Sequence, residues 1–195
     1  GVMDPVEAND PGADDTEAVQ GALVEGASDN DISQMRSSAT GYADAYEMYL
    51  ELGWPGVLPL KPGTKSPPPA GYTGRGRPDP TPEQMAEWAQ SSTYRNGGLG
   101  LRLPDIVIGI DVDAYGTKTG AVTLAETEKR WCPLPPTLRS SSRDDGVSGI
   151  KLYRVPPGTE LKGVITFPDL GIGGIDIIQN HHRYAVCAPS IHPEG

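Results

Sequence analysis

Three aspartates follow or interrupt apolar stretches of the chain. Asp111 and Asp113 come directly after the apolar run 106–110, and Asp176 lies inside the apolar run 174–178. If these runs are strands, alternation points Asp111 and Asp113 to the same side of a sheet. Neighbouring carboxylates repel each other unless a cation lies between them, and their oxygens suit Mg²⁺ or Mn²⁺. The group indicates a divalent-metal site, although a solvated strand end would explain the first pair and an ion pair with Arg or Lys would explain Asp176.

Three carboxylates on adjacent strands fit a two-metal reaction, in which ions about 4 Å apart clamp the attacking and leaving oxygens of a phosphoryl transfer. Basic side chains must then meet the phosphates, and the segment 139–151 supplies Arg139, Arg143 and Lys151 among hydroxyls and glycines. Lys151 is the strongest candidate because it begins a strand directly after a small-residue turn that contains Ser148. An ordinary exposed hairpin would give the same pattern.

Other basic residues lie where they could meet a nucleic-acid backbone. Lys65, Arg75 and Arg77 belong to a Gly/Pro-rich loop that runs to about residue 80 and could track a template strand. A solvated loop explains the same residues. Adjacent side chains on a strand face opposite ways, so the pair His181-His182 is a poor joint metal site and takes a turn or DNA-facing position. Arg183, which follows the pair, is a further DNA-binding candidate.

The elements that must position these residues alternate between helical and strand patterns, which predicts an α+β fold. Apolar residues recur at helical spacing from Tyr42, and Gly53 can end that helix in a left-handed cap. Thr81, Pro82 and Gln84 form a helix start with a hydroxyl N-cap, a proline at the first position and a capping-box glutamine. A third helix is expected over 119–130, and strands are expected near 57–60, 99–102, 106–110, 137–141, 149–155, 174–178 and 183–188.

Charge is distributed unevenly along the 195 residues, whose net charge is −10. Residues 1–40 contain nine acidic residues and one arginine, so they account for −8 and leave the rest of the chain nearly neutral. The same segment lacks hydrophobic periodicity, and we predict that it is a disordered acidic arm. The negative total therefore does not argue against a nucleic-acid partner for residues 41–195.

Only Cys132 and Cys187 occur, without a C-x-x-C spacing, so we expect neither a disulfide framework nor bound zinc. No stretch approaches the roughly 18 apolar residues of a membrane-spanning helix, and no signal-peptide pattern begins the chain. We expect an intracellular protein without a membrane partner.

Further motifs accompany these residues in a fixed order along the chain. They are Tyr49, Gly53-Trp54, Pro59-Leu60, Lys65-Ser66-Pro67-Pro68, the helix from Thr81 to Trp88, Leu99 to Leu101, Ile110-Asp111-Val112-Asp113, Pro136-Thr137, Ser148-Gly149, Leu152-Tyr153, Ile175-Asp176 and Ala188-Pro189-Ser190-Ile191-His192-Pro193 with Gly195. No single motif is decisive, but their joint order over residues 41–195 resembles the primase-polymerase (prim-pol) domain of the archaeo-eukaryotic primase superfamily.

The resemblance implies an RRM-like core with a mixed or antiparallel sheet flanked by helices. In that family the D-x-D or D-x-E pair and a later aspartate bind the catalytic metals, which points to Asp111, Asp113 and Asp176 here. A family histidine in an S-x-H motif contacts the nucleotide phosphates. That histidine is missing here, Lys151 occupies the best-matching position, and the inserted residues 143–146 depart from the shorter family loop.

The implied activity is template-dependent DNA priming and polymerisation with dNTPs or NTPs, on a single-stranded DNA template with a primer, using two Mg²⁺ or Mn²⁺ ions. The resemblance also implies phage or plasmid replication in a bacterial cytoplasm, and a C-terminally truncated piece of a larger protein that carries a helicase domain. The alternatives are a weakly active or inactive prim-pol-like module that binds DNA or partners, or another metal-dependent phosphodiester enzyme such as a nuclease. The residues expected to meet the triphosphate or to line the rim are Lys151, Arg143, Ser148, Arg139, Ser190 and His192.

Overall fold

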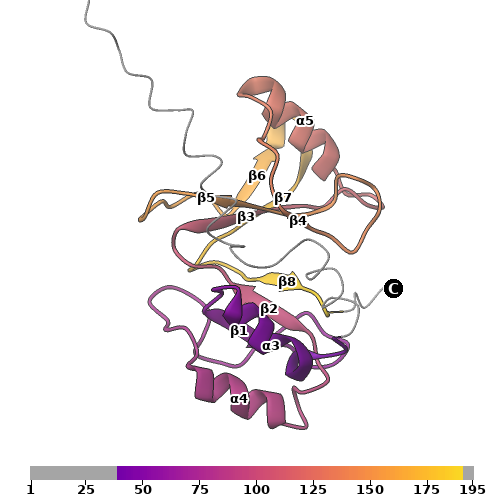
Figure 1. Ribbon diagram of the computed structural model, residues 1–195. Coiled ribbons are helices and arrows are strands. Elements are labelled where there is room, and N and C mark those ends of the chain that lie inside the picture. Colours follow the sequence, from indigo (N-terminus) through magenta and orange to yellow (C-terminus); the bar gives the residue numbers. More distant parts are fainter. Residues whose placement is uncertain (1–38, 191–195) are drawn as a thin grey trace, which may run out of the picture.

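The computed structural model describes residues 39–190 (Figure 1). Nearly all of the predicted acidic arm, and the predicted rim residue His192, lie outside this range. Within it, three α-helices and eight strands form an α+β fold, as predicted, and every strand pair is antiparallel. None of the helices between residues 39 and 190 is long and apolar enough to cross a membrane.

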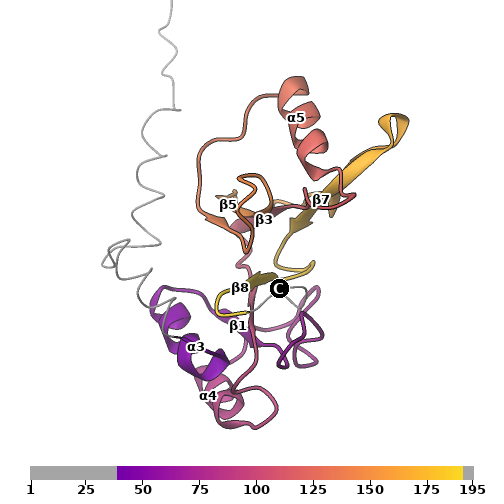
Figure 2. The same ribbon diagram turned by 90° about the vertical axis from the view of Figure 1, so that its right-hand side faces the viewer.

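The elements are stacked in four layers (Figures 1 and 2). Helix α5 (Gly120–Arg130) covers the outer face of a five-stranded sheet. The inner face of that sheet is turned toward a three-stranded sheet. Helices α3 (Tyr42–Glu51) and α4 (Pro82–Gln90) cover the far side of the three-stranded sheet. Among residues 39–190, no helix lies between the two sheets.

Local sequence explains where the first two helices begin and end. The Thr81 hydroxyl accepts a hydrogen bond from the Gln84 N–H at 3.2 Å, and Pro82 takes the first position of α4. Helix α3 ends just before Gly53, which adopts φ +84° and donates its N–H to the Leu50 carbonyl at 2.9 Å. The Thr81 cap with Pro82 and the left-handed Gly53 were predicted from the sequence and are confirmed. The Gln84 side chain, predicted to complete a capping box, instead accepts from the Tyr72 hydroxyl at 3.3 Å and donates to Glu87 at 2.8 Å.

The three-stranded sheet has the order β1-β2-β8. Its strands are β1 (Gly56–Pro59), β2 (Leu99–Arg102) and β8 (Ala185–Cys187). Every residue of β1 and β2 is buried. Leu58 and other side chains of this sheet share one apolar cluster with residues of the five-stranded sheet, including Ile178, so the two sheets pack together over part of their facing surfaces.

The five-stranded sheet has the order β4-β5-β3-β7-β6, with β3 at its centre. Its strands are β3 (Val107–Val112), β4 (Arg139–Ser140), β5 (Gly149–Arg154), β6 (Val164–Phe167) and β7 (Ile172–Ile178). The central position of β3 agrees with the nearly continuous apolar run 106–110 from which it was predicted.

Alternation along β3 divides its side chains between two environments. Ile108 and Ile110 pack in a cluster with Leu124 of α5. Val107 belongs instead to the cluster shared with the three-stranded sheet. Asp111 has the same parity as Val107, so its carboxylate projects from the inner face, toward the other sheet.

Strand β6 was not predicted. It lies at the edge of the five-stranded sheet and is joined to β7 by the 3-10 turn Pro168–Leu170. Val164 is 47% exposed, and the strand alternates between exposed and less exposed residues. Its β-branched and aromatic residues, bounded by Gly163 and Pro168, are a local strand signal that was overlooked. Strands β4 and β8 are shorter than the predicted 137–141 and 183–188.

Candidate active site

Two of the three aspartates lie side by side at the centre of the five-stranded sheet, and the third follows the end of its central strand. Asp111 of β3 stands directly opposite Asp176 of β7 in the antiparallel register, so both carboxylates project from the inner face. Asp113 follows the end of β3, and its N–H donates to the Gly174 carbonyl at 2.8 Å. Its own carbonyl accepts from the Gly120 N–H at 2.9 Å. Backbone bonds therefore tie Asp113 both to β7 and to the start of α5.

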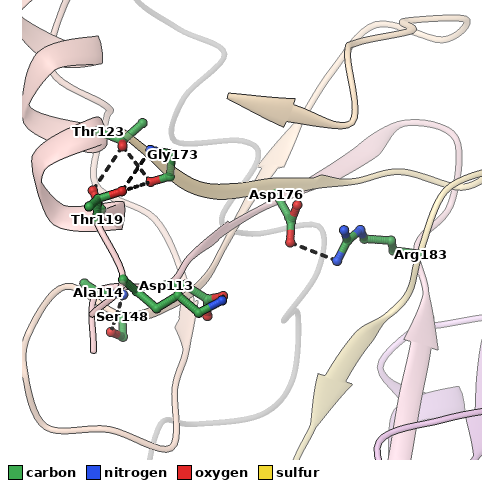
Figure 3. A network of polar contacts seen from close by, with 9 residues as sticks. Asp113, Ala114, Thr119, Thr123, Ser148, Gly173, Asp176 and Arg183 are labelled. Carbon is green, nitrogen blue, oxygen red and sulfur yellow. Dashed lines mark hydrogen bonds and ion pairs between the residues drawn. The ribbon is translucent and has the colours of Figure 1, made fainter. Parts of the chain in front are cut away.

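Two threonines fasten the start of α5 to β7 next to these aspartates (Figure 3). The Thr119 hydroxyl donates to the Gly173 carbonyl at 3.0 Å and accepts from the Gly173 N–H at 2.8 Å. The Thr123 hydroxyl donates to the same carbonyl at 2.6 Å. A Cβ at Gly120 would lie 2.2 Å from the Asp113 carbonyl oxygen, so this close approach requires glycine. Sequence reasoning did not single out this anchor.

A pocket of about 350 Å³ lies beside Asp111 and Asp113, between the two sheets. One wall is formed by the residues around these aspartates and by parts of the segment 140–150. The opposite wall is formed by β8 with its flanks, and Lys65 reaches the pocket from its loop. A volume of this size is typical of small-ligand sites. Asp176 stands beside the pocket rather than in its lining.

Asp111 is a largely buried carboxylate with two other carboxylates nearby. Burial raises the pKa of Asp111, and the negative charges of Asp113 and Asp176 raise it further. The positive charges of Arg183 and Lys65 act in the opposite direction, and the resulting pKa is about 6. A cation placed among these oxygens would favour the ionised form of Asp111.

Two of the carboxylates already have basic partners. A guanidinium nitrogen of Arg183 lies 2.8 Å from an Asp176 oxygen (Figure 3), and the Lys118 ammonium lies 3.5 Å from an Asp113 oxygen. Among residues 39–190, no three His, Cys, Asp or Glu side chains converge into a group that could hold a metal ion. The ion pair that the sequence left open for Asp176 is present. Arg183, predicted as a DNA-binding residue, contacts this carboxylate.

The turn that carries the predicted phosphate-binding residues is organised by Asp145. The Asp145 carboxylate accepts from the N–H groups of Val147 at 2.9 Å and Ser148 at 2.7 Å, and the Ser148 hydroxyl also donates to it. Ser148 is buried, and its oxygen accepts from the Ala114 N–H at 3.2 Å. Ser148 therefore links this turn to the residue that follows Asp113, in addition to lining the pocket.

Aromatic side chains complete the pocket. Arg143 lines it, and the guanidinium carbon lies 3.7 Å from the centroid of the Tyr115 ring. Tyr184 lines the opposite wall and donates its hydroxyl to the Lys65 carbonyl at 2.6 Å. Sequence reasoning named neither tyrosine as a site residue. The available signal was an aromatic residue two positions beyond Asp113.

Lys151 and Arg139 belong to the outer face of the sheet. Lys151 stands opposite Ile110, and Arg139 stands opposite Lys151, so both share the face of Ile110 rather than that of Asp111. Neither residue lines the pocket. Arg139 donates instead to the Ser148 carbonyl at 3.3 Å. The register does not support the predicted role of Lys151, because a one-residue step along a strand moves a side chain to the other face.

The predicted DNA-binding residues of the 61–80 loop are not gathered at one place. Lys65 is exposed and lines the pocket. Arg75 is paired with Glu160 at 2.5 Å, and both side chains are more than half exposed. Arg77 is exposed. Of the three, Lys65 is the residue that the fold brings to the aspartates.

The sequence of residues 46–195 matches the protein family described as "Bifunctional DNA primase/polymerase, N-terminal". The match covers well over half of the chain, and the chain belongs to this family. Membership implies a DNA primase/polymerase, which is a nucleotidyltransferase that acts on DNA and nucleotides in replication, and polymerases of this kind are typically metal-dependent. The family and enzyme class predicted from the motif order are thereby confirmed. No curated protein and no solved structure matches the chain.

Proposed function

We propose that the chain catalyses template-dependent nucleotidyl transfer with two Mg²⁺ or Mn²⁺ ions held by Asp111, Asp113 and Asp176. The observation that carries this proposal is the register of β3 and β7, which sets Asp111 opposite Asp176 on the inner face. Asp113 lies two residues further on, beside the same pocket. The donor set suits such ions, since carboxylate oxygens are the ligands they prefer. Burial, and then the charges of Asp113 and Asp176, raise the pKa of Asp111, and a cation beside it would offset both effects.

Bound ions would stabilise the charge on the attacking and leaving oxygens of the transfer. The chain's own residues bind and orient the nucleotide. Arg143 and Lys65 lie in the pocket wall, where their charges meet a triphosphate. Ser148 fixes the position of the turn that carries Arg143 relative to Asp113, because it bonds both to Asp145 in the turn and to the N–H of Ala114, which follows Asp113. Catalysis by these residues consists of positioning and charge neutralisation.

Single-stranded DNA template and primer would approach the pocket past Lys65, and the exposed Arg77 of the same loop would contact the strand away from the pocket. Arg75 can join them when its exposed pair with Glu160 opens. Arg139 acts on the nucleotide only through the turn, by its bond to the Ser148 carbonyl. Phage or plasmid replication in a bacterial cell, with a helicase as partner, is proposed on the resemblance of the motif order alone.

The alternative of an inactive binding module has one observation in its favour. Arg183 and Lys118 already neutralise Asp176 and Asp113, as they would in a domain whose aspartates serve stability alone. The raised pKa of Asp111 argues against that alternative, because two ion pairs leave the central carboxylate unfavourably placed.

The test is primer extension and de novo priming on single-stranded DNA with Mn²⁺ and then Mg²⁺. Wild type is compared with Asp111→Asn and Asp176→Asn, and with Asp105→Asn, which removes one exposed charge just before β3. The proposal expects synthesis that needs the metal, survives in Asp105→Asn and is lost in the other two variants. A folded protein that binds DNA but synthesises nothing with either ion would support the binding module, and cleavage of strands in place of synthesis would support a nuclease.

A further inference from the structure

The turn between β7 and β8 delivers Arg183 to Asp176. Gln179 and His182 exchange two backbone hydrogen bonds of 2.9 Å, which close a tight turn. The buried Gln179 amide donates to the Leu161 carbonyl at 2.9 Å and accepts from the Leu161 N–H at 2.8 Å. Arg183 follows with φ +68° and, within residues 39–190, is alone among non-glycine residues in having positive φ. An unfavourable backbone conformation held by a well-anchored turn is a feature of functional sites.

The pair with Arg183 engages the carboxylate that the proposed metal site requires. Figure 3 shows the Asp176 side chain directed at the Arg183 guanidinium, with a separation of 2.8 Å. A guanidinium at this distance offsets much of the carboxylate charge that would otherwise attract an ion, and it occupies acceptor sites of one Asp176 oxygen. The pair between Asp113 and Lys118 has the same effect more weakly, at 3.5 Å.

We propose that Arg183 is a positioning residue that makes metal binding depend on nucleotide binding. The inference rests on the proposed function, in which Asp176 is a metal ligand. Paired with one Asp176 oxygen, Arg183 weakens the attraction of this carboxylate for a divalent ion. The phosphates of an incoming nucleotide offer the guanidinium a stronger anionic partner, because Arg binds phosphate oxygens in a bidentate manner. Arg183 then turns to the triphosphate, and Asp176 turns to the ions.

The surroundings of Arg183 allow this exchange. Its side chain is 49% exposed, so it can change partners without disturbing the apolar core. A pair that is half exposed is also weakly held, which keeps the exchange within reach of a triphosphate. The location of Lys65 and Arg143 in the pocket beside Asp111 brings the phosphates to the same side of the sheet as Arg183.

The test measures Mn²⁺ binding to the full chain by calorimetry, with and without a non-hydrolysable dNTP analogue. Arg183→Gln is compared with Lys118→Gln, which opens the weaker pair, and with Arg154→Gln, an exposed arginine at the far end of β5. We expect Arg183→Gln to bind Mn²⁺ alone roughly two- to fivefold more tightly than wild type, as the loss of a half-exposed competing pair allows. The gain in affinity caused by the nucleotide should shrink in this variant, change less in Lys118→Gln and stay at the wild-type value in Arg154→Gln.

Arg183→Lys keeps the charge and loses the bidentate geometry, so its Mn²⁺ affinity should fall between wild type and Arg183→Gln. Equal effects of Arg183→Gln and Arg154→Gln would overturn the inference, because general charge would then explain both. Weaker Mn²⁺ binding by Arg183→Gln would also overturn it. If Asp176→Asn abolishes Mn²⁺ binding but Arg183→Gln leaves the Mn²⁺ affinity unchanged, the role proposed for Arg183 fails and the proposed metal site stands. If wild type binds no Mn²⁺ with or without the nucleotide, the proposed metal site fails with it.

Discussion

The two sheets differ in how fully the charges of their buried or partly buried side chains are compensated. In the three-stranded sheet the buried Arg102 is fully satisfied, by Asp79 at 2.7 Å and by the backbone and side-chain oxygens of Asn180. In the five-stranded sheet Asp111 and Asp176 stand side by side, and burial, with the charges of Asp113 and Asp176, raises the pKa of Asp111. One sheet is arranged for stability, whereas the other keeps an unfavourable charge distribution that a cation would relieve.

The largest expected effect is a loss of polymerase activity without a loss of folding stability, caused by a substitution in the five-stranded sheet. Asp111→Asn removes a proposed metal ligand, and we expect primer extension to fall by roughly 10²- to 10⁴-fold, since metal ions contribute several kcal/mol to such transition states. The free energy of unfolding, measured in parallel by urea titration, should not decrease. Synthesis within tenfold of wild type would contradict the assignment.

A core substitution in the three-stranded sheet should have the converse effect, lowering stability while leaving activity unchanged. Leu58 is completely buried, so Leu58→Ala should lower the free energy of unfolding by about 2–5 kcal/mol through lost contacts and the resulting cavity. Polymerisation per folded molecule, measured well below the melting temperature, should stay close to the wild-type value. A loss of activity larger than the unfolded fraction would show that the two sheets are not separable in this way.

The pH dependence of stability should report Asp111 directly. Its pKa rises from 3.8 to about 6 in the folded protein, so its neutral form stabilises the fold. This contribution is fully present below pH 3.8 and is lost as the pH rises through about 6. With chelator present, wild type should therefore lose about 1 kcal/mol more than Asp111→Asn between pH 5 and 7.5, after allowance for solvent screening. If stability changes with pH in the same way in both proteins, Asp111 does not have a raised pKa in the folded state.

The smallest expected effects on activity come from comparing a basic residue of the pocket wall with one on the outer face of the five-stranded sheet. Arg143→Gln should raise the KM for the nucleotide roughly three- to tenfold, as the loss of a charged phosphate contact allows. Lys151→Gln, on the outer face, should change this KM less than twofold. Steady-state kinetics at constant ionic strength measure both. A larger effect of Lys151→Gln than of Arg143→Gln would restore the role that the sequence suggested for Lys151.

Much of the fold could be predicted because its signals are local. The cap formed by Thr81, the left-handed Gly53 and the buried run that became β3 each depend on neighbours within a few residues. Edge strand β6 carries a local signal too, a run of β-branched and aromatic residues between Gly163 and Pro168, but the run is only four residues long and was overlooked. At the proposed site, the residue types could likewise be predicted locally, whereas the contacts between distant segments could not.

By itself, the sequence determined the residue types for metal and phosphate chemistry, the class of fold and, through the order of its motifs, the family. The tertiary structure alone decided which of these residues meet. Register put Asp176 opposite Asp111 and turned Lys151 to the outer face, and the β7–β8 turn brought Arg183 to Asp176. The physical reason is that strand pairing has a two-residue period, so a single-residue difference in register, which no local pattern encodes, decides the face on which each side chain lies.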